Sequence, residues 1–277
     1  MRHNAASPAR AGPGGKVPVT AAIRASFRPI VVIPARMAST RLPGKPLADI
    51  HGAPMIVHVL RRAEAAAIGP VLVACAEAEI KQAVERAGGR AVLTRPDHPS
   101  GSDRIHEALG LADPERRHDV VVNLQGDLPM VDPALLRAVL SPLADPAVDI
   151  GTIAVPVRDP AERDNPNVVK AAAGFAAGQR IARALYFSRL PVPWGAGEHY
   201  HHIGIYAYRR AALERFVGLA PGVLERRESL EQLRALQAGM RIDVALVDSL
   251  PFGVDTPADL DRARALLAPA GSPSQTP

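Results

Sequence analysis

Short runs of β-branched residues alternate with amphipathic segments from residue 30 to about residue 123, and this alternation limits the fold more than any other feature. Strands are expected at 30–34, 70–74, 91–93 and 119–123, with helices around 54–67, 77–87 and 102–112 between them. Strands that alternate with helices of this length form βαβ units, and the resulting sheet is covered on both faces. The sequence therefore predicts an α/β fold with a Rossmann-like, mostly parallel central sheet flanked by helices.

The second half of the chain has a more mixed pattern. Four runs with hairpin-like spacing read as strands, at 149–157, 167–173, 180–188 and 202–208. A helix near 224–238 and a strand at 241–247 precede a last helix from about 257 to 268, which Thr256 could cap and Pro257 could open. We expect a smaller mixed β subdomain here, without a flexible linker near residue 150.

The excess of positive charge belongs to the N-terminus. Residues 1–28 contain five Lys and Arg and no acid, which accounts for the whole excess of 33 basic over 28 acidic residues. The folded body is therefore formally neutral, which argues against a nucleic-acid-binding protein. No apolar run approaches the roughly 20 residues that span a bilayer.

The domain prediction follows from this distribution. We expect a disordered basic tail at 1–28, a single domain at 29–268 with halves at 29–150 and 151–268, and a disordered tail at 269–277. The single cysteine, Cys75, excludes an internal disulfide and follows an apolar strand, so it reads as a small buried residue.

The segment "VVIPARMASTRLPGKPL", residues 31–47, joins a buried strand to a cationic loop. Arg36, Arg41 and Lys45 lie close together there with no acid, on backbone restrained by two prolines and Gly44. The segment matches neither G-x-x-x-x-G-K-[ST] nor G-x-G-x-x-G, which argues against nicotinamide and flavin enzymes. Confined cations favour an anionic ligand, and a polyphosphate is the first hypothesis. A solvated basic turn is the alternative.

Two aspartates follow predicted strands or turns in the same way. Asp127 in "NLQGDLPMVDP" comes just after a strand, and Asp255 lies in the turn of "PFGVDTPADL". Each could simply cap a turn or a helix. Ligands of such sheets bind beyond the carboxyl ends of the strands, and two carboxylates there would suit Mg²⁺ bound together with phosphate oxygens. This combination is typical of phosphoryl or nucleotidyl transfer.

The order of several motifs resembles the 3-deoxy-D-manno-octulosonate (Kdo) cytidylyltransferase family. They are "VVIPARMASTRLPGKPL", "HPSGSDRIHEA", "NLQGDLPMVDP", "NPNVVK", "ALYFSRLPVPW", "HIGIYAYR", "LEQLRAL" and "GVDTPADL", spread over residues 30–267. The resemblance implies a fold of the nucleotide-diphospho-sugar transferase type. It also implies the reaction CTP + Kdo → CMP-Kdo + pyrophosphate, with Mg²⁺, in the cytoplasm, in a homodimer that serves lipopolysaccharide synthesis.

The resemblance also implies roles for individual residues. In the triphosphate-binding loop these are Arg36, Ser39, Arg41 and Lys45, and near the cytidine they are Ser100, Gly101 and Arg104. The expected metal ligands are Asp127 and Asp255, which with Arg36 and Lys45 form the expected catalytic group. Around the sugar acid the expected residues are Gln125, Arg189, His202, Tyr206, Glu231 and Gln232.

These residue types suit the implied reaction. A guanidinium pairs well with the sugar carboxylate, and Gln, His, Tyr and Glu match sugar hydroxyls. No Ser, Cys or His nucleophile is required, so we expect direct displacement without a covalent intermediate. Trp194 reads as a packing anchor or a dimer contact.

The chain departs from the family pattern in two places, and alternatives stay open. Ala76 stands where the family usually has Asp, and Leu128 replaces an acid in the usual "QGDEP". Another sugar acid, such as sialic acid or an amino-substituted Kdo, is one alternative. A nucleotide-binding relative that has lost catalysis is the other.

Overall fold

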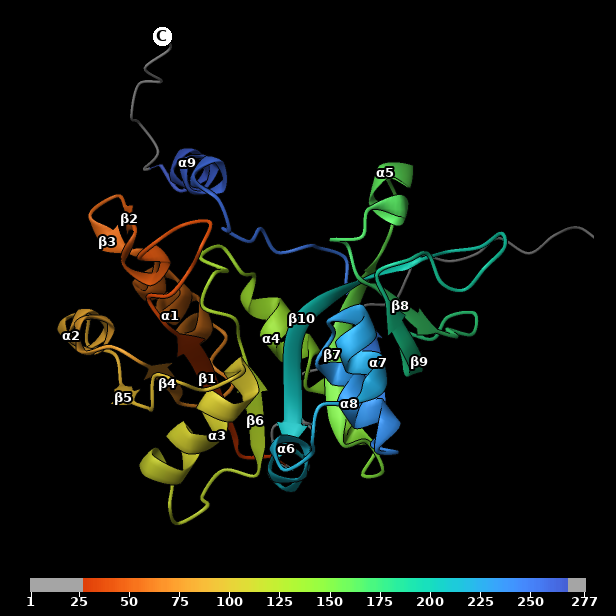
Figure 1. The fold of residues 1–277 in the computed structure, drawn as a ribbon, viewed down its shortest axis with the longest axis horizontal. Coiled ribbons are helices and arrows are strands. Elements are labelled where there is room, and N and C mark those ends of the chain that lie inside the picture. The colour runs from red at the N-terminus through yellow and green to blue at the C-terminus, as the bar shows by residue number, and fades with distance from the viewer. Residues whose placement is uncertain (1–26, 269–277) are drawn as a thin grey trace, which may run out of the picture.

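The computed structural model describes residues 27–268. Its centre is a nine-stranded sheet in the order β5-β4-β1-β6-β10-β7-β11-β9-β8 (Figure 1). The tails expected at 1–28 and 269–277 lie outside the described residues, apart from Phe27 and Arg28. Within the described part, no helix combines the length and the apolar character needed to cross a membrane.

The first four strands in space are parallel, as the sequence predicts. They are β1 (Pro29–Ala35), β4 (Val71–Cys75), β5 (Ala91–Leu93) and β6 (Val120–Asn123). Helices connect them, namely α1 (Met55–Ala65), α2 (Ala78–Arg86) and α3 (Gly101–Ala112). Between β1 and α1 lie the short helix η1 (Lys45–Leu47) and a small hairpin, β2 (Asp49–Ile50) with β3 (Ala53–Pro54).

The rest of the sheet is mixed, so the prediction of a mostly parallel sheet is wrong for the whole molecule. The long strand β10 (Tyr200–Arg209) lies antiparallel between β6 and β7 (Ile150–Pro156). Beyond β7 come β11 (Ile242–Leu246), parallel to it, then β9 (Ile181–Ser188) and β8 (Lys170–Ala173), which form an antiparallel pair. Of the consecutive strands expected to pair as hairpins, only β8 and β9 pair with each other. The hydrophobic pattern of β10 predicts a strand, but it does not indicate between which strands β10 inserts or in which direction it runs.

One pairing curls the far end of the sheet. Lys170 of β8 pairs with His201 of β10, which makes β10, β7, β11, β9 and β8 a closed cycle of paired strands. The expected smaller mixed β region is therefore continuous with the main sheet.

Helices cover both faces of the sheet. Apolar residues of α1, α2 and α4 (Pro133–Ala138), with η2 (Ser141–Ala144) beside them, pack on one face. On the other face pack α3, α6 (Arg210–Val217) and α8 (Gln232–Gln237). Side chains of β1 alternate between the two clusters, because successive residues of a strand point to opposite faces.

The remaining helices are peripheral. The last helix, α9 (Pro257–Leu266), begins after the Thr256 cap predicted from the sequence and packs on the β2–β3 hairpin. The helix expected at 224–238 is two helices, α7 (Val223–Glu228) and α8, because Ser229 takes a left-handed conformation with φ of 54°. The short α5 (Pro160–Asp164) and the helix α6 were not anticipated.

Candidate active site

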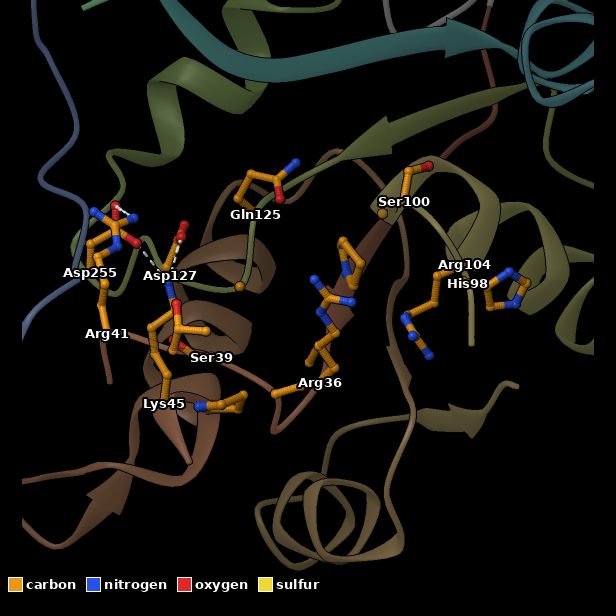
Figure 2. A pocket seen from close by; sticks show the side chains of 17 residues that line it. Arg36, Ser39, Arg41, Lys45, His98, Ser100, Arg104, Gln125, Asp127 and Asp255 are labelled. Atoms are coloured by element: carbon orange, nitrogen blue, oxygen red, sulfur yellow. Dashed lines mark hydrogen bonds and ion pairs between the residues drawn. The ribbon is translucent and has the colours of Figure 1, made fainter. Parts of the chain in front are cut away.

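A cavity of about 420 Å³ opens at the carboxyl ends of β1 and β6. Its walls come from the loop after β1, the segment that leads into α3, the loop after β6 and the turn before α9 (Figure 2). The cavity brings together all of the residues expected to bind the nucleotide or metal, namely Arg36, Ser39, Arg41, Lys45, Ser100, Gly101, Arg104, Asp127 and Asp255. Of the residues expected around the sugar acid, Gln125 lines it too.

The loop after β1 is held in place by groups outside the loop. The Met37 N–H donates to the Glu77 carboxylate at 3.1 Å, and Gly44 takes a φ of 71° just before η1. A side chain at that φ is strained, so glycine suits the position. The loop contains no acidic residue of its own, but the Glu77 carboxylate binds its backbone from outside. Glu77 directly follows Ala76, one of the two departures from the family pattern.

Lys45 lies between the two aspartates. Its Nζ is 2.9 Å from Asp127 Oδ2 and 3.0 Å from Asp255 Oδ1 (Figure 2). Burial lowers the pKa of Lys45, but the two carboxylates outweigh it, so this pKa lies above the ordinary value of 10.5. Arg41 adds a second cation, with its Nη2 3.0 Å from Asp255 Oδ2. Two carboxylates from separate loops therefore converge on one positive charge.

Asp255 is not the cap of α9. The Thr256 hydroxyl accepts from the Asp259 N–H, and the Asp259 carboxylate accepts from the Thr256 N–H in return. That reciprocal capping box leaves the Asp255 carboxylate to Lys45 and Arg41. The Val254 N–H donates to the Asp127 carbonyl at 2.9 Å, which joins the two acidic loops.

A glycine allows the loops after β1 and β6 to approach each other. A Cβ on Gly126 would lie 2.9 Å from the carbonyl oxygen of Pro34, closer than real Cβ contacts. Gly126 thus lets the backbone before Asp127 pass directly over the end of β1. The neighbouring Leu128, the second departure from the family pattern, is partly buried and packs against the core cluster on the face of the sheet that α1, α2 and α4 cover.

Arg36 differs from the other two loop cations. Its side chain is exposed at the cavity, and it has no ion-pair partner among residues 27–268. In Figure 2 it lies between the cluster around Lys45 and the wall formed by His98 and Arg104. Ser39 accepts the Leu42 N–H at 3.4 Å, a contact within the loop.

The wall expected near the cytidine is built on the start of α3. Ser100 is the N-cap, and its hydroxyl accepts from the Asp103 N–H. Arg104 is only 2% exposed, and its guanidinium donates to the Thr94 hydroxyl and to the carbonyls of Arg95 and Pro96. Arg104 thus lines the cavity and fixes the segment before α3.

The sequence interpretation missed His98 as a lining residue. It is buried, its Nε2 bonds to the Glu107 carboxylate, and it lies beside Arg104 in the cavity wall. The motif "HPSGSDRIHEA" contains both members of this pair, nine residues apart. The two side chains meet because His98, in the segment before α3, lies against Glu107 on α3 itself.

The residues expected around the sugar acid lie in a second group. Gln125 lines the cavity, whereas five others do not: Arg189, His202, Tyr206, Glu231 and Gln232. These five belong to the end of β9, to β10 and to the α7–α8 connection. Tyr206 pairs in the sheet with Asn123, two residues before Gln125, so the second group adjoins the cavity across β6.

An aromatic row follows β10. The His202 ring lies 4.7 Å from that of Phe187 and 5.5 Å from that of Tyr206, between centroids. Burial, with His201 beside it, lowers the pKa of His202 to about 3, so this imidazole is neutral at physiological pH. Burial also raises the pKa of Tyr206 well above 10, which keeps its hydroxyl protonated.

Glu231 bridges the two groups. Its Oε2 accepts from the Ser102 hydroxyl at 3.1 Å, on the first turn of α3, while its Oε1 is buried without a partner among the described residues. Burial raises the pKa of this carboxyl above 4.5, although Ser100 and Ser102 act in the opposite direction. The adjacent Gln232 is buried as well.

Arg189 acts as a clamp in this structure. Its Nε, Nη1 and Nη2 donate to the carbonyls of Glu228, Pro166 and Ser229, respectively. The guanidinium thereby ties the loop before β8 to the end of α7, and all three of its nitrogens have backbone partners.

Two other residues singled out in the sequence lie away from the cavity. Trp194 is fully exposed, so its interpretation as a packing anchor within the chain is wrong; the Gly-rich loop carries the ring away from the body. Cys75 is buried as predicted, and burial raises the pKa of its thiol to about 11.

Comparisons with known proteins agree with this arrangement. A family model described as "Cytidylyltransferase" matches residues 30–242. The 3-deoxy-manno-octulosonate cytidylyltransferase of Paramagnetospirillum magneticum is 65% identical over 88% of this chain and 99% of its own length. The protein of the same name from Methylobacterium radiotolerans is 67% identical over 86% of this chain and 96% of its own.

Solved structures give the same result. A CMP:2-keto-3-deoxy-manno-octonic acid synthetase complexed with CTP has a TM-score of 0.80 at 41% identity, over 87% of this chain and 98% of that one. A 4-diphosphocytidyl-2C-methyl-D-erythritol synthase from Anaerococcus prevotii has a TM-score of 0.58 at 12% identity, over 90% and 99% of the two chains. The second likeness is one of fold alone.

Proposed function

This chain belongs to the 3-deoxy-manno-octulosonate cytidylyltransferase family, and we propose that it joins CTP and Kdo by direct displacement at the α-phosphate of CTP. The enzyme activates Kdo with CTP and releases pyrophosphate. In the proposed step a sugar hydroxyl forms a bond to the α-phosphorus, the bond to the pyrophosphate oxygen breaks, and the hydroxyl proton passes to solvent. The observation that carries this proposal is the convergence of Lys45, Asp127 and Asp255 at one end of the cationic cavity.

The cations of the β1 loop neutralise the triphosphate in this proposal. Arg36 has no acidic partner in the described residues, so it can pair with a phosphate without first breaking an ion pair. In the structure, Lys45 is ion-paired with both Asp127 and Asp255, and Arg41 is ion-paired with Asp255. These ion pairs hold the two cations at the cavity. Such preorganised charge is what stabilises the charge that develops on the leaving pyrophosphate.

The residues present fit Mg²⁺. Asp127 and Asp255 direct hard carboxylate oxygens at one position that a positive charge already occupies, and Mg²⁺ is commonly held by one or two carboxylates together with substrate phosphates. When bound, Mg²⁺ would supply charge relief at the phosphates and lower the pKa of the attacking hydroxyl. Asp127 and Asp255 would hold it, and Lys45 would then be free to pair with a phosphate oxygen.

The second group of residues is proposed to bind the sugar. His202, Tyr206, Glu231 and Gln232 provide donors and acceptors at a buried surface next to the nucleotide cavity. Ser102 joins Glu231 to the same helix whose start lines that cavity. A sugar there would lie between the two halves of the chain, next to the α-phosphate.

We propose further that the enzyme is a cytoplasmic homodimer. Four large apolar side chains on or after β9 are exposed in the single chain, namely Ile181, Leu185, Leu190 and Trp194. A second copy would remove such a surface from water. Sedimentation of the wild type should give twice the mass of one chain, and a Leu185→Glu, Trp194→Glu variant should give the mass of one.

The experiment that tests the reaction is pyrophosphate release from CTP, Mg²⁺ and Kdo. We expect turnover that requires Kdo, and a loss of at least about 100-fold in kcat for Asp127→Asn. Asp132→Asn is the matched control on the same loop, because asparagine can keep the helix cap that Asp132 makes with the Ala134 N–H. Turnover without Kdo would contradict the function, and full activity of Asp127→Asn would contradict the metal assignment.

A further inference from the structure

Thr152 is a buried polar residue that neither the sequence interpretation nor the proposed function uses. It lies in the middle of β7 with a relative exposure of 0%, and it pairs with Tyr206 of β10 on one side and Val244 of β11 on the other. Its hydroxyl oxygen is 3.0 Å from His202 Nε2. A hydroxyl at this depth must be part of a hydrogen-bond network.

The backbone around Thr152 decides how its single proton is used. The pairing of β7 with β10 shifts between Ile203 and Tyr206, a β-bulge, and there the Thr152 Oγ1 lies 2.9 Å from the Ile205 carbonyl oxygen and 3.4 Å from that of Ile203. Carbonyl oxygens can only accept. The Thr152 hydroxyl therefore donates to the Ile205 carbonyl, since the opposite orientation would leave oxygen lone pairs facing each other at 2.9 Å.

This orientation fixes the tautomer of His202. Because the only hydroxyl proton is used on the Ile205 carbonyl, the Thr152 oxygen faces His202 as an acceptor, and Nε2 must carry the hydrogen. His202 is also neutral, since burial holds its pKa far below physiological pH. In a neutral imidazole with hydrogen on Nε2, the other nitrogen, Nδ1, is an acceptor with a free lone pair. Nδ1 has no hydrogen-bond partner among residues 27–268.

We propose that Thr152 is a positioning residue that presents His202 Nδ1 to the sugar acid as a hydrogen-bond acceptor. This inference rests on the proposed sugar-binding role of His202. It specifies the chemistry recognised at that point: a hydroxyl of the sugar, which can donate, and not a carboxylate or carbonyl oxygen, which cannot. The rings of Phe187 and Tyr206 pack against the imidazole, with tilted interplanar angles of 60° and 54°, and restrict its movement.

The first test is the tautomer itself, read by nitrogen–proton correlation NMR on protein labelled at histidine. The His202 signals are assigned by their absence in a His202→Gln variant. We expect the wild type to show neutral His202 with hydrogen on Nε2, and the Nδ1 signal to move when Kdo is added without CTP. A charged His202, hydrogen on Nδ1, or an Nδ1 chemical shift that stays unchanged at saturating Kdo would overturn the proposal.

The second test uses Thr152→Val, which keeps the shape and removes the hydroxyl, with Thr152→Ser as the matched control that keeps it. Loss of one hydrogen bond to the substrate predicts a KM for Kdo raised about tenfold in Thr152→Val, with kcat and the KM for CTP within about twofold of wild type. Thr152→Ser should behave like wild type in kinetics and in tautomer. An unchanged KM for Kdo in a folded Thr152→Val, or an equal loss in Thr152→Ser, would contradict the positioning role.

The two tests separate this inference from the proposed function. If Thr152→Val does not fold, the wild-type tautomer and its response to Kdo still decide the inference. Absence of turnover with Kdo in the wild type would refute the proposed reaction, whereas the tautomer of His202 would remain measurable on the same sample.

Discussion

The cavity that we propose for the nucleotide and the group that we propose for the sugar are built for opposite means of recognition. At the cavity, charged side chains face open space: Arg41 is 64% exposed, and Arg36 has no ion-pair partner in the described chain. In the sugar-binding group, His202 and Gln232 are 7% and 6% exposed and work through neutral hydrogen-bonding groups. The first region is suited to a charged ligand, and the second to a ligand with directed hydrogen-bonding groups.

This difference fits the two ligands that we propose for these regions. A triphosphate brings several negative charges and needs cations that can reach it, so the cations sit on a loop at the open edge of the sheet. A sugar offers hydroxyls whose geometry must be read one by one, and buried groups with fixed directions do this best. The cavity should therefore be sensitive to loss of charge, and the sugar-binding group to loss of shape or tautomer.

The largest effect is expected from Lys45→Met. The change removes the charge that Asp127 and Asp255 share, so that Asp127 loses its ion-pair partner in the described chain and Asp255 keeps only Arg41. We expect kcat/KM to fall by about 100- to 1,000-fold, since one preorganised donor to developing charge is worth that much. Lys81→Met is the matched control, because the only ion-pair partner of Lys81 among residues 27–268 is Glu85, on the surface of α2. A loss below tenfold would show that Lys45 does not stabilise the transition state.

A smaller loss of function but a clear loss of stability is expected from Arg104→Met. This side chain is buried, and its removal leaves the Thr94 hydroxyl and two backbone carbonyls without their donor. Unsatisfied buried groups cost about 1–3 kcal/mol, so the free energy of unfolding should fall by roughly that amount and the KM for CTP should rise. Denaturant titration measures the first quantity, with the exposed Arg61→Met as control. Unchanged stability would mean that the segment before α3 is held by other contacts.

The sequence anticipated the cavity better than the sugar-binding group, for a physical reason. Parallel strands end at a common edge, so loops that follow β1 and β6 must meet there, and Asp127 could be placed opposite the β1 loop. The partners themselves are remote: Lys45 contacts Asp127 and Asp255 across 82 and 210 residues of sequence, which no local pattern reveals. The direction of β10 and the break at Ser229 depend on tertiary packing in the same way.

The Glu231→Gln variant should show that the carboxylate proposed to bind the sugar lowers the free energy of unfolding. Burial raises the pKa of Glu231, so the folded state disfavours its charge. That cost is fully present above the folded pKa and absent below the ordinary value of 4.5; stability from this group therefore declines as pH rises through the interval between them. At pH 7 the variant should be as stable as wild type or more stable by about 1 kcal/mol, with the KM for Kdo raised about tenfold.

Stability measured against pH gives the check on Glu231. The variant should lose the part of the slope that lies above pH 4.5, whereas Glu64→Gln, an exposed change on α1, should keep it. A destabilised Glu231→Gln protein would show that the charge is stabilised by its surroundings, contrary to the direction inferred from its burial.

The smallest effect, and the one that compares the two regions in a single sample, is the response to salt. Exposed cations are screened at moderate ionic strength, whereas hydrogen bonds between neutral buried groups are not. Raising monovalent salt from about 0.05 M to 0.5 M, over which the Debye length falls roughly threefold, should raise the KM for CTP several-fold. The KM for Kdo should change less, because His202, Tyr206 and Gln232 carry no charge and the Glu231 carboxylate has a buried oxygen, which leaves the carboxylate of the sugar as the main charge exposed to screening. Equal shifts in the two constants would mean that charge also dominates at the sugar, and Arg189 would then have to leave its three backbone carbonyls to meet it.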